Sequence, residues 1–105
     1  MTRVFYEPED FHVRVEGHAG SAPKGEDLVC AAVSALAWTL ADAAQDYQAG
    51  VLINETAAII DVRCWPNARD EEKCEQMFGV IMGGFRLLAD KYPEFIKIGG
   101  ADNGR

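Results

Sequence analysis

The residues of this sequence that could carry chemistry are His18 and Cys30, which lie twelve positions apart. A loop of Gly, Ser, Ala, Pro and Lys separates them, and the cysteine comes near the start of a stretch that predicts a helix. A thiolate paired with an imidazole is the usual form of an activated cysteine nucleophile. The spacing alone leaves two interpretations open: a catalytic pair, or a loop histidine and a helix cysteine that never meet.

The expected helix favours ionisation of Cys30. If the helix begins near Asp27, the Asp27 carboxylate can accept a hydrogen bond from a free backbone N–H group of the first turn. Cys30 then lies in that turn, where the unpaired N–H groups and the helix dipole stabilise a thiolate. Ser34, one turn further along the same face, can donate a hydrogen bond to the sulfur. Asp27 and Ser34 are therefore predicted to support the site.

The loop around His18 is rich in glycine. Gly17 and Gly20 flank the histidine, and Gly25 follows before the expected helix. Glycine adopts backbone conformations that other residues avoid and leaves room for another backbone to approach. We expect these glycines to let the loop move and to let a peptide substrate come close to the cysteine.

The elements that would position this pair are strands and two helices. Apolar residues that alternate with polar ones predict strands, and the first two are expected to form a hairpin around the turn EPED. The strands are predicted at residues 2–6, 11–16, 51–54, 57–64 and 94–99.

The two helices are predicted from apolar residues that recur at steps of three and four. The first runs from Asp27 to Tyr47, and the second opens after Pro66 with Asn67 as its N-cap and stops before Pro93. Gly79, Gly83 and Gly84 interrupt the second helix and are interpreted as positions of close packing. The apolar stripes are Val29, Val33, Leu36, Leu40, Ala44 and Tyr47 in the first helix, and Cys74, Met77, Phe78, Ile81, Phe85, Leu88 and Tyr92 in the second.

The order of these elements, β-β-α-β-β-α-β, predicts a mixed fold of the α/β (α+β) class. A length of 105 residues, without repeats or linker-like segments, predicts a single domain over residues 1–105. Hairpins interspersed with helices favour a two-layer structure. We expect a largely antiparallel sheet of about five strands with both helices packed on one face.

The charge and the cysteines exclude several classes of protein. The formal net charge is −7, and no dense cluster of Lys and Arg could follow a phosphate backbone, so nucleic-acid binding is not expected. The acidic surface either attracts a basic partner or only keeps the protein in solution. Three cysteines, Cys30, Cys64 and Cys74, form no CxxC motif and argue against a disulfide framework. No metal site and no cofactor are predicted, because the spacing of these residues to the histidines is irregular.

The location is predicted from the absence of targeting patterns. No apolar run approaches the roughly 20 residues of a membrane-spanning helix, and the first residues, MTRVFYEPED, lack the apolar segment of a signal peptide. We therefore expect a cytoplasmic protein with no membrane contact.

These motifs resemble those of the bacterial ribosomal-processing cysteine proteases. That family has a Gly-His-Ala, a flexible loop, a Gly-x-Asp and an aliphatic pair that leads into Cys-Ala-x-Val-Ser-Ala-Leu. The motif occurs here as Gly17-His18-Ala19, Gly25-Glu26-Asp27, Leu28-Val29 and Cys30-Ala31-Ala32-Val33-Ser34-Ala35-Leu36. KYPEFIKI, residues 91–98, is similar to the end of the family's chains, so the resemblance covers nearly the whole sequence.

The resemblance implies a reaction and a substrate. His18 would be the general base and Cys30 the nucleophile of an endopeptidase. Gly17, Ala19, Gly20 and Gly25 would belong to the substrate loop. The family removes a short N-terminal extension from a basic large-subunit ribosomal protein, the bacterial twenty-seventh, by cleavage after an aromatic residue during ribosome assembly. The resemblance also implies that the protein is a homodimer in the bacterial cytoplasm and has a mobile loop over the site.

The sequence departs from the family in two places near the expected substrate entrance. Ser21, Ala22, Pro23 and Lys24 stand where relatives often carry an aromatic residue, and the first hairpin has EPED in place of the usual Asp-Gly turn. Both differences affect the expected cleavage sequence more than the chemistry.

Two other functions are compatible with the same residues. A non-catalytic ribosome-assembly or peptide-binding module would keep the motif for its shape and bind the leader without cutting it. A thiol enzyme of another specificity, such as an acyl transferase or thioesterase, would use the same nucleophile on a different substrate.

Overall fold

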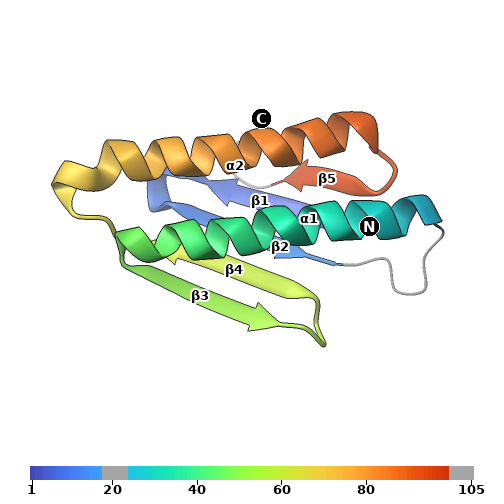
Figure 1. Cartoon of the computed structure of the whole chain (residues 1–105), viewed down its shortest axis with the longest axis horizontal. Helices are drawn as coiled ribbons and strands as arrows, with labels where there is room; N and C mark the ends of the chain where they lie inside the picture. Colours follow the sequence, from blue (N-terminus) through green and yellow to red (C-terminus); the bar gives the residue numbers. More distant parts are fainter. Residues whose placement is uncertain (18–23, 100–105) are drawn as a thin grey trace.

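The computed structural model describes residues 1–17 and 24–99, with the backbone alone described for residues 24–27. Its elements follow the predicted order β-β-α-β-β-α-β, with short 3-10 helices at three of the connections (Figure 1). The main elements are β1 (Thr2–Glu7), β2 (His12–Glu16), α1 (Lys24–Ala43), β3 (Ala49–Asn54), β4 (Ile59–Cys64), α2 (Glu71–Lys91) and β5 (Ile96–Gly99). The 3-10 helices are η1 (Pro8–Asp10), η2 (Ala44–Tyr47) and η3 (Ala68–Asp70).

The five strands form one open sheet in the order β3-β4-β2-β1-β5. The pairs β1–β2, β2–β4 and β3–β4 are antiparallel, and β1–β5 is parallel. Both helices lie on the same face of the sheet, and none of the helices and strands that the structure describes covers the opposite face, here called the uncovered face (Figure 1). The predicted fold class, a two-layer and largely antiparallel sheet with two helices on one face, is confirmed.

The core lies between the helices and the sheet. Because strand side chains alternate between the two faces, every second strand residue points toward the helices. The rings of Tyr6 from β1 and Phe78 from α2 stack at a centroid distance of 6.1 Å. The largest fully buried side chains are Val4, Val13, Val29, Leu40, Val62, Cys64, Cys74, Phe78, Met82, Phe85 and Ile96.

The first helix begins earlier than the sequence pattern indicates. α1 starts at Lys24, so Asp27 lies inside the helix and is not its N-cap. The prediction was wrong because the apolar stripe begins at Val29, and residues 24–27 contribute no apolar side chain that would have marked the first turn. The α-helix ends at Ala43 and continues as η2.

The second helix also begins differently. η3 precedes α2, and Asn67 makes no side-chain cap; its Oδ1 atom instead accepts a hydrogen bond of 3.0 Å from Gln48 Nε2. The predicted N-cap is therefore wrong. The end of the helix is as expected, since α2 stops at Lys91, shortly before Pro93.

The stretch Leu28–Tyr47 is long and apolar enough, by length and composition alone, to cross a membrane. The sequence analysis expected no run of this kind. Val29, Val33 and Leu40 of this stretch are only 1%, 6% and 1% exposed and pack in the core. A core helix of a two-layer fold has this composition, so packing against the sheet accounts for its apolar character.

Candidate active site

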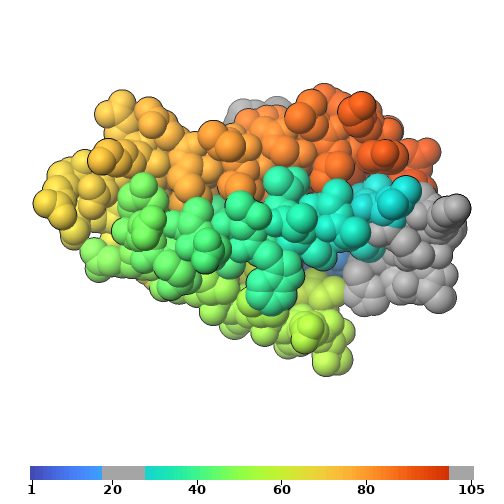
Figure 2. Space-filling view, in the orientation of Figure 1, coloured from blue at the N-terminus to red at the C-terminus, as the bar shows by residue number. Residues whose placement is uncertain are grey.

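Cys30 lies on the wall of a cavity between α1 and the β3–β4 hairpin. The cavity has a volume of about 340 Å³ and is lined by residues of α1, of β3 and β4 with their connecting turn, and of the ends of β1 and β2. Ser34 and Trp38 follow Cys30 at steps of four on α1, and a step of four keeps side chains on one face of a helix. Figure 2 shows the β3–β4 hairpin emerging from under α1 on the face that carries the helices.

Cys30 is the accessible thiol among the three cysteines. It is half-buried, whereas Cys64 and Cys74 are 1% and 0% exposed. Burial, together with the nearby Cys74 thiol, raises the pKa of Cys64 to about 12. Burial also raises the pKa of the Cys74 thiol. These two cysteines stay protonated near neutral pH and belong to the core.

The electrostatic argument for Cys30 changes with the helix start. Cys30 is the seventh residue of α1 and therefore lies in the second turn. The influence of the helix dipole falls off within the first turn, so the helix end stabilises a thiolate at Cys30 less than predicted. Asp27 cannot support the site as an N-cap. Ser34, by contrast, lines the same cavity as Cys30.

Gly17 connects the cavity to the loop that carries the predicted base. Its N–H donates a hydrogen bond of 2.9 Å to the carbonyl of Ala58, and its carbonyl accepts one of 3.4 Å from Thr2 Oγ1. Gly17 has a φ of +90° and lines the cavity together with Cys30. The chain is therefore held against the cavity wall at the residue that directly precedes His18.

The remaining predicted loop residues divide into two groups. His18, Ala19 and Gly20 lie outside the described residues. Gly25 lies in the first turn of α1, so its prediction as a loop residue is wrong.

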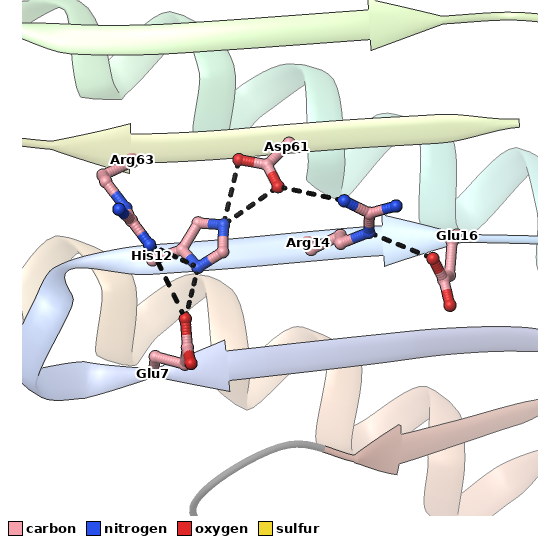
Figure 3. Close-up of polar contacts among 6 residues, drawn as sticks. All are labelled: Glu7, His12, Arg14, Glu16, Asp61 and Arg63. Atoms are coloured by element: carbon pink, nitrogen blue, oxygen red, sulfur yellow. Dashed lines mark hydrogen bonds and ion pairs between the residues drawn. The ribbon is translucent and has the colours of Figure 1, made fainter.

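The second histidine of the sequence, His12, faces away from Cys30. Its neighbours in β2, Val13 and Val15, point into the core, so His12 projects from the uncovered face of the sheet. Its Nδ1 atom lies 2.6 Å from Glu7 Oε1 and its Nε2 atom 2.9 Å from each carboxylate oxygen of Asp61 (Figure 3). Since the chain has two histidines, a histidine base for Cys30 would have to be His18.

The charged side chains around His12 form ion pairs with one another. Arg14 lies 3.0 Å from Glu16 and 3.7 Å from Asp61, and Arg63 lies 3.8 Å from Glu7 (Figure 3). This network accounts for the polar residues of the middle strands on the uncovered face. His12 is part of this network and lies on the face of the sheet opposite the cavity that Cys30 lines.

Sequence reasoning missed most of the cavity wall. Trp38 could have been found from its helical spacing to Cys30 and Ser34. Ile53, Asn54 and Glu55 also line the cavity, but they come from the β3–β4 hairpin. Their placement depends on how β4 pairs with β2, and no local pattern in the sequence carries that information.

Comparisons with known proteins identify the family and the fold of the chain. The model of the family described as the cysteine protease Prp matches residues 3–97. The crystal structure of SMU.848 from Streptococcus mutans is 27% identical, with a TM-score of 0.74 over 94% of this chain and 90% of that one. None of the curated proteins matches this sequence significantly.

Two further similar structures are of the essential ribosomal processing protease Prp from S. aureus. The complex with a substrate peptide is 15% identical, with a TM-score of 0.77 over 95% of this chain and 97% of that one. The complex with a covalently linked product peptide is 18% identical, with a TM-score of 0.77 over 96% and 100%. At these identities the likeness establishes the shared fold.

Proposed function

We propose that this chain, which belongs to the family of the cysteine protease Prp, is an endopeptidase that removes the short N-terminal extension of a large-subunit ribosomal protein. The observation that carries the proposal is the position of Cys30, an accessible thiol on the wall of a cavity, in a chain whose family is one of cysteine proteases. The proposed substrate is the bacterial twenty-seventh large-subunit protein.

In the proposed mechanism Cys30 is the nucleophile and His18 the general base. His18 takes the thiol proton, and the sulfur attacks the scissile carbonyl to form a tetrahedral intermediate. The protonated imidazole then donates its proton to the leaving amine, which departs with the C-terminal part of the substrate and leaves a thioester on Cys30. Water, activated by the same imidazole, hydrolyses the thioester and restores the thiol.

The residues near Cys30 and His18 have proposed roles that rest on different observations. Ser34 lines the cavity, where its hydroxyl can donate a hydrogen bond to the Cys30 sulfur. Asp27 rests on the family motif alone, because the N-cap argument does not hold. Gly17 lines the cavity and immediately precedes His18 in the chain, so its position limits where the histidine can lie.

The cavity and the charge of the chain fit the proposed substrate. Val33, Trp38 and Ile53 give the cavity apolar walls, and its volume of about 340 Å³ can hold a large apolar side chain. Cleavage after an aromatic residue is consistent with such a cavity. A net charge of −7 favours the approach of a basic ribosomal protein. We propose action in the bacterial cytoplasm, where ribosomes assemble, as a homodimer without metal or cofactor.

A synthetic peptide that spans the N-terminal extension of the host protein tests the proposal. We expect wild-type protein to cut the peptide at one bond, and Cys30→Ala to bind but not cut it. Cys64→Ala is the matched control, because it removes a thiol that lies in the core and should retain cleavage once its fold is verified by circular dichroism.

Mass spectrometry of the products distinguishes the alternatives. Full cleavage by Cys30→Ala would contradict the proposed nucleophile. A wild-type protein that binds the peptide and leaves it intact would indicate a non-catalytic binding module. Thioester formation from small acyl esters, but not from the peptide, would indicate a thiol enzyme of another specificity.

A further inference from the structure

β3 forms an edge of the sheet, and in the described part of the chain no strand pairs with its outer side. All six of its residues pair with β4, which lies on its inner side. The backbone N–H and C=O groups that point outward are thus free to pair with another extended chain. Figure 1 shows β3 as the outermost strand, beyond the edge of α1.

This edge lacks the features with which proteins protect a strand from pairing. Natural edge strands carry Lys, Pro or a bulge, or are very short. β3 has the sequence AGVLIN, without charge or proline, and Leu52 and Ile53 are 57% and 39% exposed. The opposite edge, β5, is only four residues long and carries the exposed Lys97. The two edges therefore differ, and β3 is the one suited to pairing.

The free edge leads directly to the candidate nucleophile. Ile53 and Asn54, at the end of β3, line the same cavity as Cys30. Trp38 of α1 lines it from the helix side and is 52% exposed. A chain laid along the outer edge of β3 would therefore reach, at Ile53 and Asn54, the rim of the cavity in which Cys30 lies.

We propose that the peptide substrate binds as an additional strand on the outer edge of β3, which brings its scissile bond to Cys30. This inference rests on the proposed endopeptidase function and adds the mode of substrate recognition. Hydrogen bonds between the two backbones would supply affinity that does not depend on side chains, and the side chains on one face of the added strand would enter the cavity. Those on the other face would lie beside Leu52 on the uncovered side of the sheet.

Strand addition predicts a period of two along the peptide. In a β-ladder every second N–H of an edge strand points to its partner, and those between point away. A series of leader peptides, each N-methylated at one successive amide, is titrated against the inactive Cys30→Ala variant. We expect the dissociation constant to rise about three- to tenfold at alternate positions, as for the loss of one backbone hydrogen bond, and to change little between them.

Amide hydrogen exchange of the protein shows which edge of the sheet pairs with the bound peptide. We expect alternate amides of residues 49–54 to exchange more slowly when unmodified peptide is bound to Cys30→Ala, with residues 96–99 unchanged as an internal control. Protection of both edges, or of neither, would contradict the proposal. A uniform response to N-methylation would contradict it as well.

The outcomes separate this inference from the proposed function. Cleavage of the peptide by wild-type protein without protection of β3 overturns strand addition and leaves the endopeptidase in place. Absence of both binding and cleavage overturns both. Slowed exchange of β3 that requires no peptide and increases with protein concentration overturns the inference too, because it shows that a second copy of this chain occupies the edge.

Discussion

Gly84 on α2 lies so close to Leu36 on α1 that a Cβ atom at position 84 would be 2.7 Å from Cδ2 of Leu36. Gly79 and Gly83 of the same helix have no atom within 4 Å of a Cβ built in their place. The interpretation of all three glycines as close-packing positions therefore holds for Gly84 alone. At position 79 no close neighbour requires a glycine.

We expect Ala substitutions at Gly84 and Gly79 to change stability in opposite directions. Gly79→Ala should raise the free energy of unfolding by up to about 1 kcal/mol, because alanine is the better helix former and meets no neighbour. Gly84→Ala should lower it by about 1 kcal/mol, because displacing Leu36 costs more than the helix gains. Urea denaturation measures both. Equal shifts in the two variants would show that Leu36 moves aside at no cost.

We expect one of the three thiols to react rapidly in the folded protein. A chromogenic disulfide reagent at pH 8 should modify Cys30 alone, because Cys64 and Cys74 are buried and burial raises the pKa of both thiols. Denaturation should release the other two. The Cys30→Ala variant is the control and should show no fast phase; a fast phase that survives in it would mean that the core opens readily.

The buried thiol of Cys64 should make stability depend on pH in the alkaline range. Its pKa rises from 9 to about 12 on folding, so above pH 9 the thiol ionises in the unfolded state and remains neutral in the folded state. The stabilisation is complete below pH 9 and is lost as the pH rises toward 12. We expect the free energy of unfolding to fall less steeply over this range in Cys64→Ala than in wild-type protein. Parallel slopes in urea titrations from pH 8 to 11 would contradict this.

The elements of the fold could be predicted because their signals are local. The alternation in FHVRVE and the helical spacing of Val29, Val33 and Leu40 each reflect one buried face, and these strands and helices appear as expected. The start of α1 could not be found in this way, because residues 24–27 are glycine or charged and do not extend the apolar stripe. The sequence pattern detects helices by their apolar spacing, and a helical turn without apolar residues gives no such signal.

The candidate site was predictable only in part, for a related reason. Cys30 and Ser34 share one helix face and could be grouped from spacing alone. Ile53 reaches the same cavity because β3 pairs with β4 and β4 with β2, contacts between segments far apart in the sequence. The parallel pairing of β1 with β5 was missed for the same reason.

Removing His12 should affect stability and leave catalysis intact. His12→Ala deprives Glu7 and Asp61 of a shared partner in a half-buried network, and we expect a loss of about 1 kcal/mol in the free energy of unfolding. Peptide cleavage should stay within about twofold of wild type, because the imidazole lies on the face of the sheet opposite Cys30. His18→Ala is the matched comparison, with little change in stability and a loss of about 100-fold or more in kcat. A comparable loss of activity in His12→Ala would contradict the assignment of the base.

Gly17 should be needed for both the fold and the reaction. Its φ of +90° is a conformation that glycine adopts at low cost, and a Cβ there would clash with the backbone carbonyl oxygen of Met1. We expect Gly17→Ala to lower the free energy of unfolding by about 1–3 kcal/mol.

The effect on activity separates strain at Gly17 from a role in positioning. Relief of the clash with Met1 would shift the backbone at Gly17, whose N–H now donates a hydrogen bond of 2.9 Å to the carbonyl of Ala58, and His18 is the next residue in the chain. We therefore expect kcat to fall at a temperature where the variant remains folded by circular dichroism, with the affinity of the Cys30→Ala,Gly17→Ala double variant for the leader peptide nearly unchanged. A variant that loses stability but retains full kcat would show that Gly17 serves the fold alone.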